Sequence, residues 1–262
     1  GHCYRCRTVI EPYLSNQWFI RMKPLAKAAI EAHDKGLVTF YPERWTKVYL
    51  SWLENVRDWC ISRQIWWGHR IPAWHCKGCG ETAISTEKPD TCLKCGRNEH
   101  DQDEDVLDTW FSSALWPFST MGWPDATKEL DYYYPTSTLV TDRGIIYFWV
   151  ARMVMMGLEL KNDVPFHHVY IHGTILDDLG RKMITVEGQD IKLHENRFEM
   201  GRNFINKVWN AARFVMMNLT SGQSLAVQIE DNDYEFEDIW ILNRLSVVTE
   251  ASTAALEKYK FN

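Results

Sequence analysis

The chain has 262 residues, a formal net charge of -6, 45% hydrophobic residues and 24% charged residues. This length accommodates one large or two modest domains, and the composition is ordinary for a globular protein. The negative charge argues against a DNA reader with an overall basic surface, although it leaves room for RNA bound at a local patch. The longest apolar run is far shorter than the ~20 residues that cross a bilayer, and the polar start lacks a signal-peptide pattern, so we expect a cytoplasmic protein without a membrane partner.

Six of the seven cysteines fall in Cys-x-x-Cys pairs, which indicate metal ligands in a reducing compartment rather than disulfides. Two of these pairs lie twelve residues apart within 76–95. Four thiolates match the tetrahedral preference of Zn(II) and leave no open coordination position, so we predict a structural zinc site rather than a catalytic one. The predicted ligands are Cys76, Cys79, Cys92 and Cys95.

Two other features near these pairs are less specific. The polar segment 82–91 is expected to be the loop between the two knuckles. The first pair, Cys3 and Cys6, has no second pair nearby in the sequence. It is either half of a further zinc site or a pair of free thiols in a turn.

The N-terminal third is predicted to be mainly helical. Pro24 suits a helix start and Gly36 a helix stop, so we expect a helix over 24–35. A short strand over 38–41 should follow. Large apolar residues then recur at helical spacing over 45–56, which is most simply a core face.

Residues 58–74 contain four tryptophans interleaved with Arg63, His69 and Arg70. One interpretation is a buried aromatic cluster whose arginines extend to solvent. The other is the wall of a cleft that faces a polar ligand. The acidic run 101–108 is expected to be a solvated face, and Trp110 could line a pocket beside small hydroxyl residues.

A strand over 137–140, a buried helix over 145–156 and a strand over 168–171 form a predicted parallel crossover. Thr141 or Asp142 should cap the helix and Gly157 should end it. Ligands bind outside the carboxyl ends of such strands, where 141–144 and 172–173 would lie.

Ile145 and Trp149 share a helix face near that edge, although a place in the helix core is the simpler interpretation. The basic turn 180–183 is either solvated or placed to meet phosphates. Beyond residue 194, two helical stretches over 204–215 and 237–258 predict a small all-helical second domain.

The motif Trp66-Trp67-Gly68-His69 and the motif Thr109-Trp110-Phe111-Ser112-Ser113 resemble those of valyl-tRNA synthetases, a branch of the class I aminoacyl-tRNA synthetases. Further matches lie at 58–72, 105–113, 148–153, 188–193 and 202–211. The resemblance implies an α/β fold: the second half of a Rossmann-like parallel-sheet catalytic domain with a zinc knuckle over 1–192. Residues 193–262 would then begin a helical anticodon-binding domain, and an editing domain would precede residue 1 in the family.

The resemblance also implies a reaction and its participants. Valine and ATP would give valyl-adenylate, and the valyl group would pass to tRNA(Val), with Mg(II) bound to the ATP phosphates and a monomeric enzyme. Trp110, Ile145 and Trp149 match the positions that wall the valine side chain. His172 and Gly173 match the adenine contact, whereas Lys182 and Met183 match the first two residues of the catalytic lysine loop.

The chain departs from the family pattern after Met183, where it continues Ile184-Thr185-Val186-Glu187 instead of Ser-Lys-Ser. The family's His-Ile-Gly-His motif is also missing from the sequence. We therefore expect this chain alone to be inactive. A non-catalytic, zinc-stabilised RNA-binding module and an isoleucyl-type synthetase are the alternatives.

Overall fold

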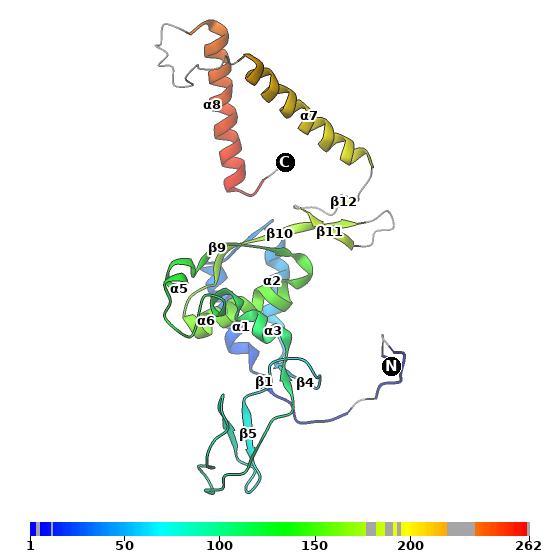
Figure 1. Ribbon diagram of the computed structural model, residues 1–262, viewed down its shortest axis with the longest axis vertical. Coiled ribbons are helices and arrows are strands. Elements are labelled where there is room, and N and C mark those ends of the chain that lie inside the picture. Colours follow the sequence, from blue (N-terminus) through cyan, green and yellow to red (C-terminus); the bar gives the residue numbers. More distant parts are fainter. Residues whose placement is uncertain are drawn as a thin grey trace. The chain divides into compact units, whose positions relative to one another are not determined.

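The computed structural model describes residues 1–3, 6–11, 13–176, 182–186, 191–192, 195–218 and 234–260. It divides into two compact units, Gly1–Val169 and Tyr170–Asn262, whose helices and strands are labelled in Figure 1. Among the described helices, none combines the length and the apolar character needed to cross a membrane.

The first unit begins with two helices that pack on each other. Helix α1 (Met22–Asp34) starts two residues before the predicted position and buries one face of small residues. It ends where Gly36 adopts a φ of +73°, as the stop signal predicted. Strand β2 (Thr39–Tyr41) and helix α2 (Arg44–Glu54) follow, and α2 buries Tyr49 and Leu53 of the predicted apolar stripe.

A strand, a helix and a second strand form the predicted crossover. Strand β9 (Thr136–Asp142) leads through the turn η1 (Arg143–Ile145) and the π-helix η2 (Ile146–Val150) into helix α6 (Ala151–Lys161). Strand β10 (Phe166–Leu176) follows and pairs with β9 and β2. The backbone N–H of Thr136 donates to Pro165 O at 3.0 Å. Both strands therefore begin side by side and run in the same direction.

The helix of this crossover matches the prediction at its start and differs from it at its end. Asp142 caps the helical segment at η1, because its side chain accepts a 2.7 Å hydrogen bond from Gly144 N. Gly157 does not end it, because α6 continues to Lys161 and stops before Asn162, whose φ is +56°. At Gly157 a Cβ would lie 2.6 Å from the Tyr134 hydroxyl and 3.0 Å from Pro165 Cδ. This glycine therefore permits close packing rather than a helix stop.

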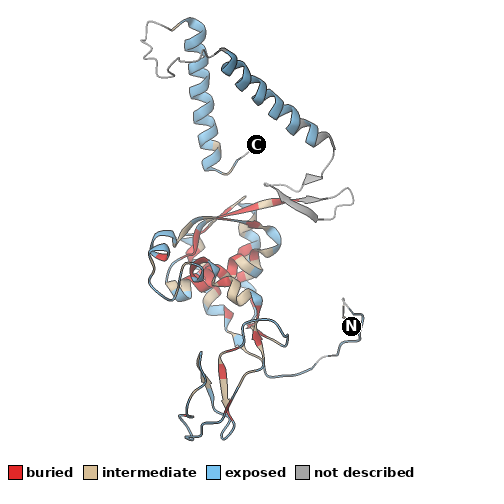
Figure 2. Ribbon diagram, viewed as in Figure 1, coloured by how far each residue is buried: buried red, intermediate tan, exposed pale blue. Residues whose placement is uncertain are grey.

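Helix α6 forms the centre of the core. Its turns from Ile146 to Met156 are largely buried, as the all-apolar sequence predicted. Figure 2 shows the buried residues gathered where α1, α2 and α6 meet. Three short helices, α3 (Thr109–Ala114), α4 (Trp116–Ser119) and α5 (Lys128–Tyr133), complete this unit, and α3 and α4 pack on α6.

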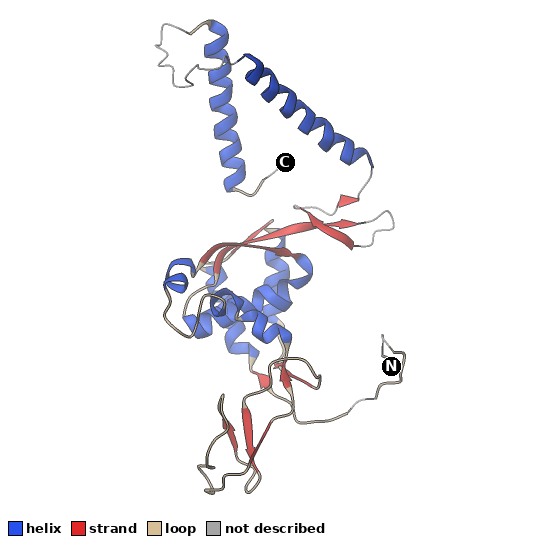
Figure 3. Cartoon of the chain, viewed as in Figure 1, coloured by secondary structure: helices blue, strands red, loops and turns tan. Residues whose placement is uncertain are grey.

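Several small antiparallel strand groups lie together at one end of this core (Figure 3). Strand β5 (Ala73–Cys76) lies between β6 (Thr82–Ile84) and β7 (His100–Gln102), so the segment predicted as a knuckle loop begins with a strand. Strand β1 (Phe19–Ile20) pairs with β3 (Trp59–Cys60), and β4 (Ser62–Arg63) pairs with β8 (Val106–Leu107).

The second unit contains the end of β10 and two long helices. Strand β10 pairs antiparallel with β11 (Lys182–Val186) and parallel with β12 (Ile191–Lys192). Helices α7 (Glu195–Asn218) and α8 (Phe236–Glu257) match the two predicted helical stretches. The predicted domain boundary after residue 192 stays a prediction, because the compact units divide within β10.

Gly157→Ala should destabilise the protein by about 1–3 kcal/mol, because the added methyl group meets Tyr134 and backbone atoms that are fixed by packing. Thermal unfolding followed by circular dichroism measures this. Gly201→Ala is the matched control, since Gly201 lies in helix α7 with nothing within 4 Å of the added Cβ. The control should be neutral or gain up to about 1 kcal/mol. Equal losses in both variants would contradict the packing role of Gly157.

Candidate functional site

The four predicted zinc ligands converge. The sulfur atoms of Cys76, Cys79, Cys92 and Cys95 all lie within 4.8 Å of one another. Two of the separations, Cys76 to Cys95 and Cys79 to Cys92, are 3.6 Å. A tetrahedron with Zn–S bonds of about 2.3 Å places its sulfurs about 3.8 Å apart. The cluster therefore has the size and the donor set of a four-cysteine metal site.

Two matching turns build this cluster. Gly80 N donates to Cys76 O at 2.9 Å, and Gly96 N donates to Cys92 O at 2.8 Å. Both glycines adopt a φ near +70° (70° and 73°), which favours glycine at these positions. Each pair therefore uses the same tight turn to bring its two thiols together.

Backbone N–H groups in these turns also favour the thiolate. The backbone N–H of Cys79 is the main cause that lowers the pKa of Cys76 to about 7. The backbone N–H of Cys95 likewise lowers the pKa of Cys92. The thiolate is the form that binds metal, so these bonds favour it at Cys76 and Cys92. At Cys79 a backbone hydrogen bond to Glu81 also lowers the pKa, but the neighbouring thiols and burial outweigh it and raise the pKa to about 12.

The first cysteine pair is different. Cys6 Sγ lies 3.2 Å from Thr8 Oγ1, and Cys3 N donates to Thr8 O at 2.8 Å, so the pair sits in a small turn. Among the described residues, neither thiol belongs to a group of three or more possible metal ligands. Both interpretations of this pair stay open.

The tryptophan-rich stretch 58–74 matches neither predicted alternative as a whole. Trp59 is buried, whereas Trp66 and Trp67 are 105% and 91% exposed. Trp74 is half-buried and donates its indole N–H to Ser85 O at 3.0 Å. The four side chains therefore form neither one buried cluster nor one common wall.

The loop that carries Trp66 and Trp67 is held by its neighbours. Arg70 Nε donates to Asp103 O at 2.7 Å, and Leu107 N donates to His69 O at 2.7 Å. At Gly68 the φ is +157°, and a Cβ would lie 2.8 Å from Val106 Cγ2. Gly68 therefore allows the loop to lie against strand β8.

The acidic run 101–108 is not simply a solvated face, which corrects the prediction. Asp103 accepts hydrogen bonds from Trp18 Nε1 at 2.9 Å and from the backbone of Asp105 at 3.0 Å, and it lies 3.2 Å from His75 Nε2. Partial burial alone would raise the pKa of Asp103, but these donors, Trp18 first, outweigh it and lower the pKa. The carboxylate thus joins three separate segments.

Asp108 is the most deeply buried carboxylate of this run, with its side chain 8% exposed. Its Oδ2 accepts the indole N–H of Trp59 at 2.9 Å and lies 2.9 Å from Arg63 Nη2. Its Oδ1 accepts the backbone N–H of Trp110 at 3.4 Å, which caps helix α3. Arg152 lies 3.9 Å from the ring of Trp59, and burial lowers its pKa to about 10. The sequence interpretation missed this cluster.

The structure brings two of the three predicted valine-wall residues onto neighbouring helices. Trp110 lies on α3 and Trp149 on η2, and these helices pack together. The indole N–H of Trp149 donates to Ser113 O on α3 at 2.9 Å. Ile145, at the end of η1, precedes the same π-helix, and all three predicted side chains are half-buried.

Aromatic rings support these two tryptophans. Trp110 stacks on Phe148 with centroids 5.5 Å apart, and Trp116 lies 5.7 Å from Trp149. Tyr147 continues the row from Phe148 towards Trp52 on α2. Next to this row is an open groove of about 680 Å³, whose lining residues are Lys47, Val48, Ser51, Trp52, Asn55 and Tyr147.

The predicted ATP-binding residues lie in the second unit. His172 and Gly173 were expected beyond a strand end, but they lie within β10, where Gly173 pairs with Val186. His172 Nδ1 is 3.1 Å from Gly173 O. Lys182 and Met183 begin β11, while the preceding part of the predicted basic turn falls outside the described residues.

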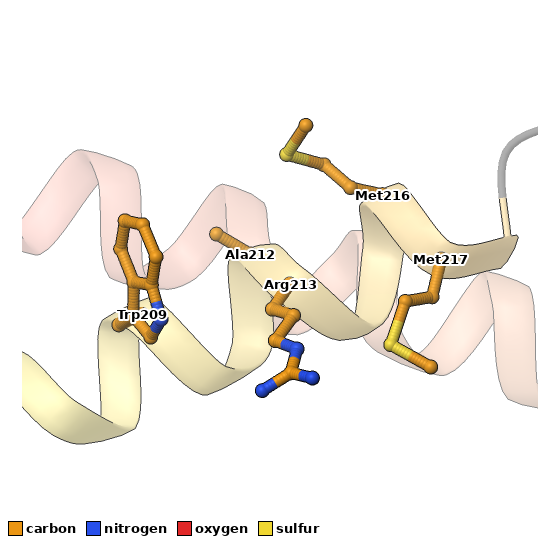
Figure 4. A pocket seen from close by; sticks show the side chains of 5 residues that line it. All are labelled: Trp209, Ala212, Arg213, Met216 and Met217. Atoms are coloured by element: carbon orange, nitrogen blue, oxygen red, sulfur yellow. The ribbon is translucent and has the colours of Figure 1, made fainter.

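Helix α7 carries a second hollow, of about 380 Å³, which is drawn in Figure 4. The lining residues are Trp209, Ala212, Arg213, Met216 and Met217. All five come from one face of one helix, so the hollow is a feature of the helix surface rather than an enclosed site.

Comparison with solved structures relates the fold to aminoacyl-tRNA synthetases. A Mycobacterium tuberculosis methionyl-tRNA synthetase in complex with methionyl-adenylate matches 98% of this chain and 51% of its own, with a TM-score of 0.67 and 15% identity. An Agrobacterium radiobacter LeuRS in a ternary complex with tRNA and LeuAMS matches 79% of this chain and 34% of its own, with a TM-score of 0.65 and 19% identity. At these identities the likeness concerns the fold.

Sequence comparison is more specific. The valine--tRNA ligase of Thermotoga maritima is 52% identical over 290 residues, covering 100% of this chain and 33% of the relative. That of Carboxydothermus hydrogenoformans is 53% identical, covering 99% of this chain and 33% of the relative. The chain thus spans about a third of the length of these relatives. The family model for class I tRNA synthetases (I, L, M and V) matches residues 5–228, and the chain belongs to this family.

Proposed function

We propose that the chain supplies the second half of the catalytic core of a valine--tRNA ligase. The whole protein would activate valine with ATP to valyl-adenylate and charge tRNA(Val). The observation that carries this proposal is the identity of 52% to a valine--tRNA ligase across the whole chain. Because the chain spans only a third of that relative, the activity is proposed for the longer protein.

The first chemical step requires positioning more than covalent chemistry. A valine carboxylate oxygen attacks the α-phosphorus of ATP in line, a new O–P bond forms, and the bond to pyrophosphate breaks. Orientation of the reactants and stabilisation of the phosphate charge supply most of the rate enhancement. Mg(II) bound with ATP would neutralise part of that charge.

The valine side chain would lie against Trp110, Ile145 and Trp149. The packing of α3 on η2 and the hydrogen bond from Trp149 to Ser113 support a wall built from these two helices. Such a rigid apolar wall excludes larger side chains by steric overlap. It rejects threonine by only about a factor of 10², because a hydroxyl replaces a methyl group without a change of shape.

The family resemblance also assigns the contacts with ATP. His172 and Gly173 would contact the adenine, Met183 would lie beside the nucleotide, and Lys182 would act as the catalytic cation on the phosphates. Lys182 begins β11, where it pairs with Leu176 of β10, so it lies on the same strand pair as Gly173 but three residues further along β10.

The four-cysteine cluster would hold a structural Zn(II). The convergence of the four thiols and the sulfur separations support this assignment. Four protein ligands leave no position for substrate, so the metal would stabilise the sheet of β5, β6 and β7 without entering the reaction.

Helices α7 and α8 would begin a helical domain that contacts tRNA. Their exposed apolar side chains support the helical domain but not the tRNA contact, since Phe204 and Trp209 are 68% exposed and Trp240 is 57% exposed. Faces of this kind normally pack against further helices of a bundle. A monomeric state and a cytoplasmic location stay predictions from the family resemblance.

A non-catalytic, zinc-stabilised RNA-binding module is the second candidate. The alignment with the Thermotoga maritima relative extends over 290 residues, more than the 262 of this chain, so the relative has residues in the matched region that this chain does not. The chain also lacks the Ser-Lys-Ser continuation after Met183. An isoleucyl-type specificity is disfavoured by the valine relatives.

Metal analysis of the purified chain should find one Zn(II) per molecule, and a strong chelator should lower its melting temperature. Cys92→Ser should reduce the zinc content and the melting temperature, because a hydroxyl does not replace a buried thiolate ligand. Cys60→Ser is the matched control, since Cys60 lies outside the cluster and should keep full zinc. Full metal content in Cys92→Ser would contradict the site.

Trp149→Ala should raise the KM for valine in ATP–pyrophosphate exchange by the full-length protein about tenfold or more, since an aromatic wall of the pocket is removed. Trp67→Ala is the matched control, because it also removes a tryptophan ring but its side chain is 91% exposed. The control should keep the wild-type KM. An unchanged KM in Trp149→Ala would refute the assigned pocket, whereas an inactive wild type would favour the RNA-binding module.

The isolated 262-residue chain should show no valine-dependent pyrophosphate exchange, because the chain lacks the histidine motif and the second lysine of the loop. The measurement is exchange by the purified chain beside a full-length valine--tRNA ligase as the positive control. Robust exchange by the chain alone would show that the remaining residues suffice.

A further inference from the structure

Asp108 links the segment 58–63 to the helix that carries Trp110. We propose that Asp108 is a positioning residue, which fixes the orientation of Trp110 and so sets which amino-acid side chains the site accepts. This inference rests on the proposed function, because it assigns a supporting residue to the same site. Asp108 itself would not touch the substrate.

Both oxygens of the Asp108 carboxylate are used as acceptors. Oδ1 accepts the Trp110 backbone N–H, while Oδ2 accepts Trp59 Nε1 and faces Arg63 Nη2 at 2.9 Å. The backbone N–H of Asp108 adds a further constraint, since it donates to Ile61 O at 2.7 Å. The start of α3 is therefore fixed from both the side chain and the main chain.

This arrangement requires a carboxylate rather than an amide. An asparagine at 108 has one acceptor oxygen and one amino group that can only donate. With its amino group in place of Oδ2, it would point a donor at the two donors Trp59 Nε1 and Arg63 Nη2. With the amide turned over, it would point a donor at the Trp110 N–H and lose the helix cap. Either orientation disrupts one half of the cluster.

A second route joins the same cluster to the ring of Trp110. Arg152 lies 3.9 Å from the Trp59 ring, and its Nη1 donates to Phe148 O at 3.3 Å. Phe148 is the ring on which Trp110 stacks, with centroids 5.5 Å apart. Asp108 is the buried anion next to the two cations Arg63 and Arg152. Loss of its charge would therefore disturb both the main chain and the ring support of Trp110.

The other tryptophan of the proposed wall depends on the same helix. Trp149 Nε1 donates to Ser113 O, in the last turn of α3, at 2.9 Å. A shift at the start of a helix of six residues (Thr109–Ala114) reaches its last turn, because a helix this short moves as one body. Asp108 is thus placed to set the spacing between Trp110 and Trp149.

The test is Asp108→Asn in the full-length protein, followed by ATP–pyrophosphate exchange with valine and with isoleucine. We expect the KM for valine to rise about tenfold or more, since a hydrogen bond to a charged group is lost. The KM for ATP should stay within about twofold of the wild-type value, and the preference for valine over isoleucine should fall. A merely structural loss would lower the amount of active enzyme and leave both KM values and the preference unchanged.

Asp103→Asn is the matched control. Asp103 also accepts an indole N–H, from Trp18 at 2.9 Å, but it binds no residue of α3. It should therefore keep the wild-type KM for valine. If Asp108→Asn does not fold, Trp59→Phe removes one donor to Oδ2 and keeps an aromatic ring, and it should raise the KM for valine by a smaller factor of roughly three.

The outcomes distinguish a failure of the proposed function from a failure of the role assigned to Asp108. A wild-type protein without valine-dependent exchange would refute the proposed function itself. An active wild type, together with an unchanged valine KM and an unchanged preference in Asp108→Asn, would overturn only the role of Asp108. An equal change in Asp103→Asn would also overturn it, because the effect would then not depend on α3.

Discussion

The first unit depends on one buried negative charge. Asp108 is almost fully enclosed, and burial of a carboxylate is costly unless cations and hydrogen-bond donors surround it. Here the carboxylate loses its hydrogen bonds to water but gains interactions with Arg63, Trp59 and the capped end of α3. Because these partners come from separate stretches of chain, the satisfied carboxylate defines how β4 and α3 meet.

The apolar core stabilises the unit, whereas the hydrogen-bonded cluster around Asp108 fixes the orientation of a helix. Helix α6 is largely buried in its first two turns and packs with α1, α3 and α4, so it contributes to the hydrophobic stabilisation of the unit. Apolar packing alone tolerates small rotations of a helix. Directed hydrogen bonds at Asp108 and Trp149 limit such rotations where the proposed substrate wall lies. The cysteine cluster fixes the small sheet of β5, β6 and β7 by the geometry of its ligands.

Local patterns predicted much of this arrangement. The start and stop signals of α1, the crossover of β9, α6 and β10, and the cysteine spacing all depend on residues close in sequence. The burial of Asp103 and Asp108 was missed because their indole partners are 85 and 49 residues away. Gly157 resembles a helix stop locally, and only its contacts with Tyr134 and Pro165 identify it as a packing position. The exposure of Trp66 and Trp67 likewise has no local signal.

The π-helix Ile146–Val150 has an evolutionary consequence. A turn with i→i+5 hydrogen bonds holds one residue more than an α-helical turn of the same rise. Deleting a single residue there would restore an ordinary α-helix and keep the segments on either side in nearly the same phase, whereas a deletion within α6 would rotate everything before it by about 100°. The lineage of this segment should therefore record a one-residue change of length at this turn more readily than within α6.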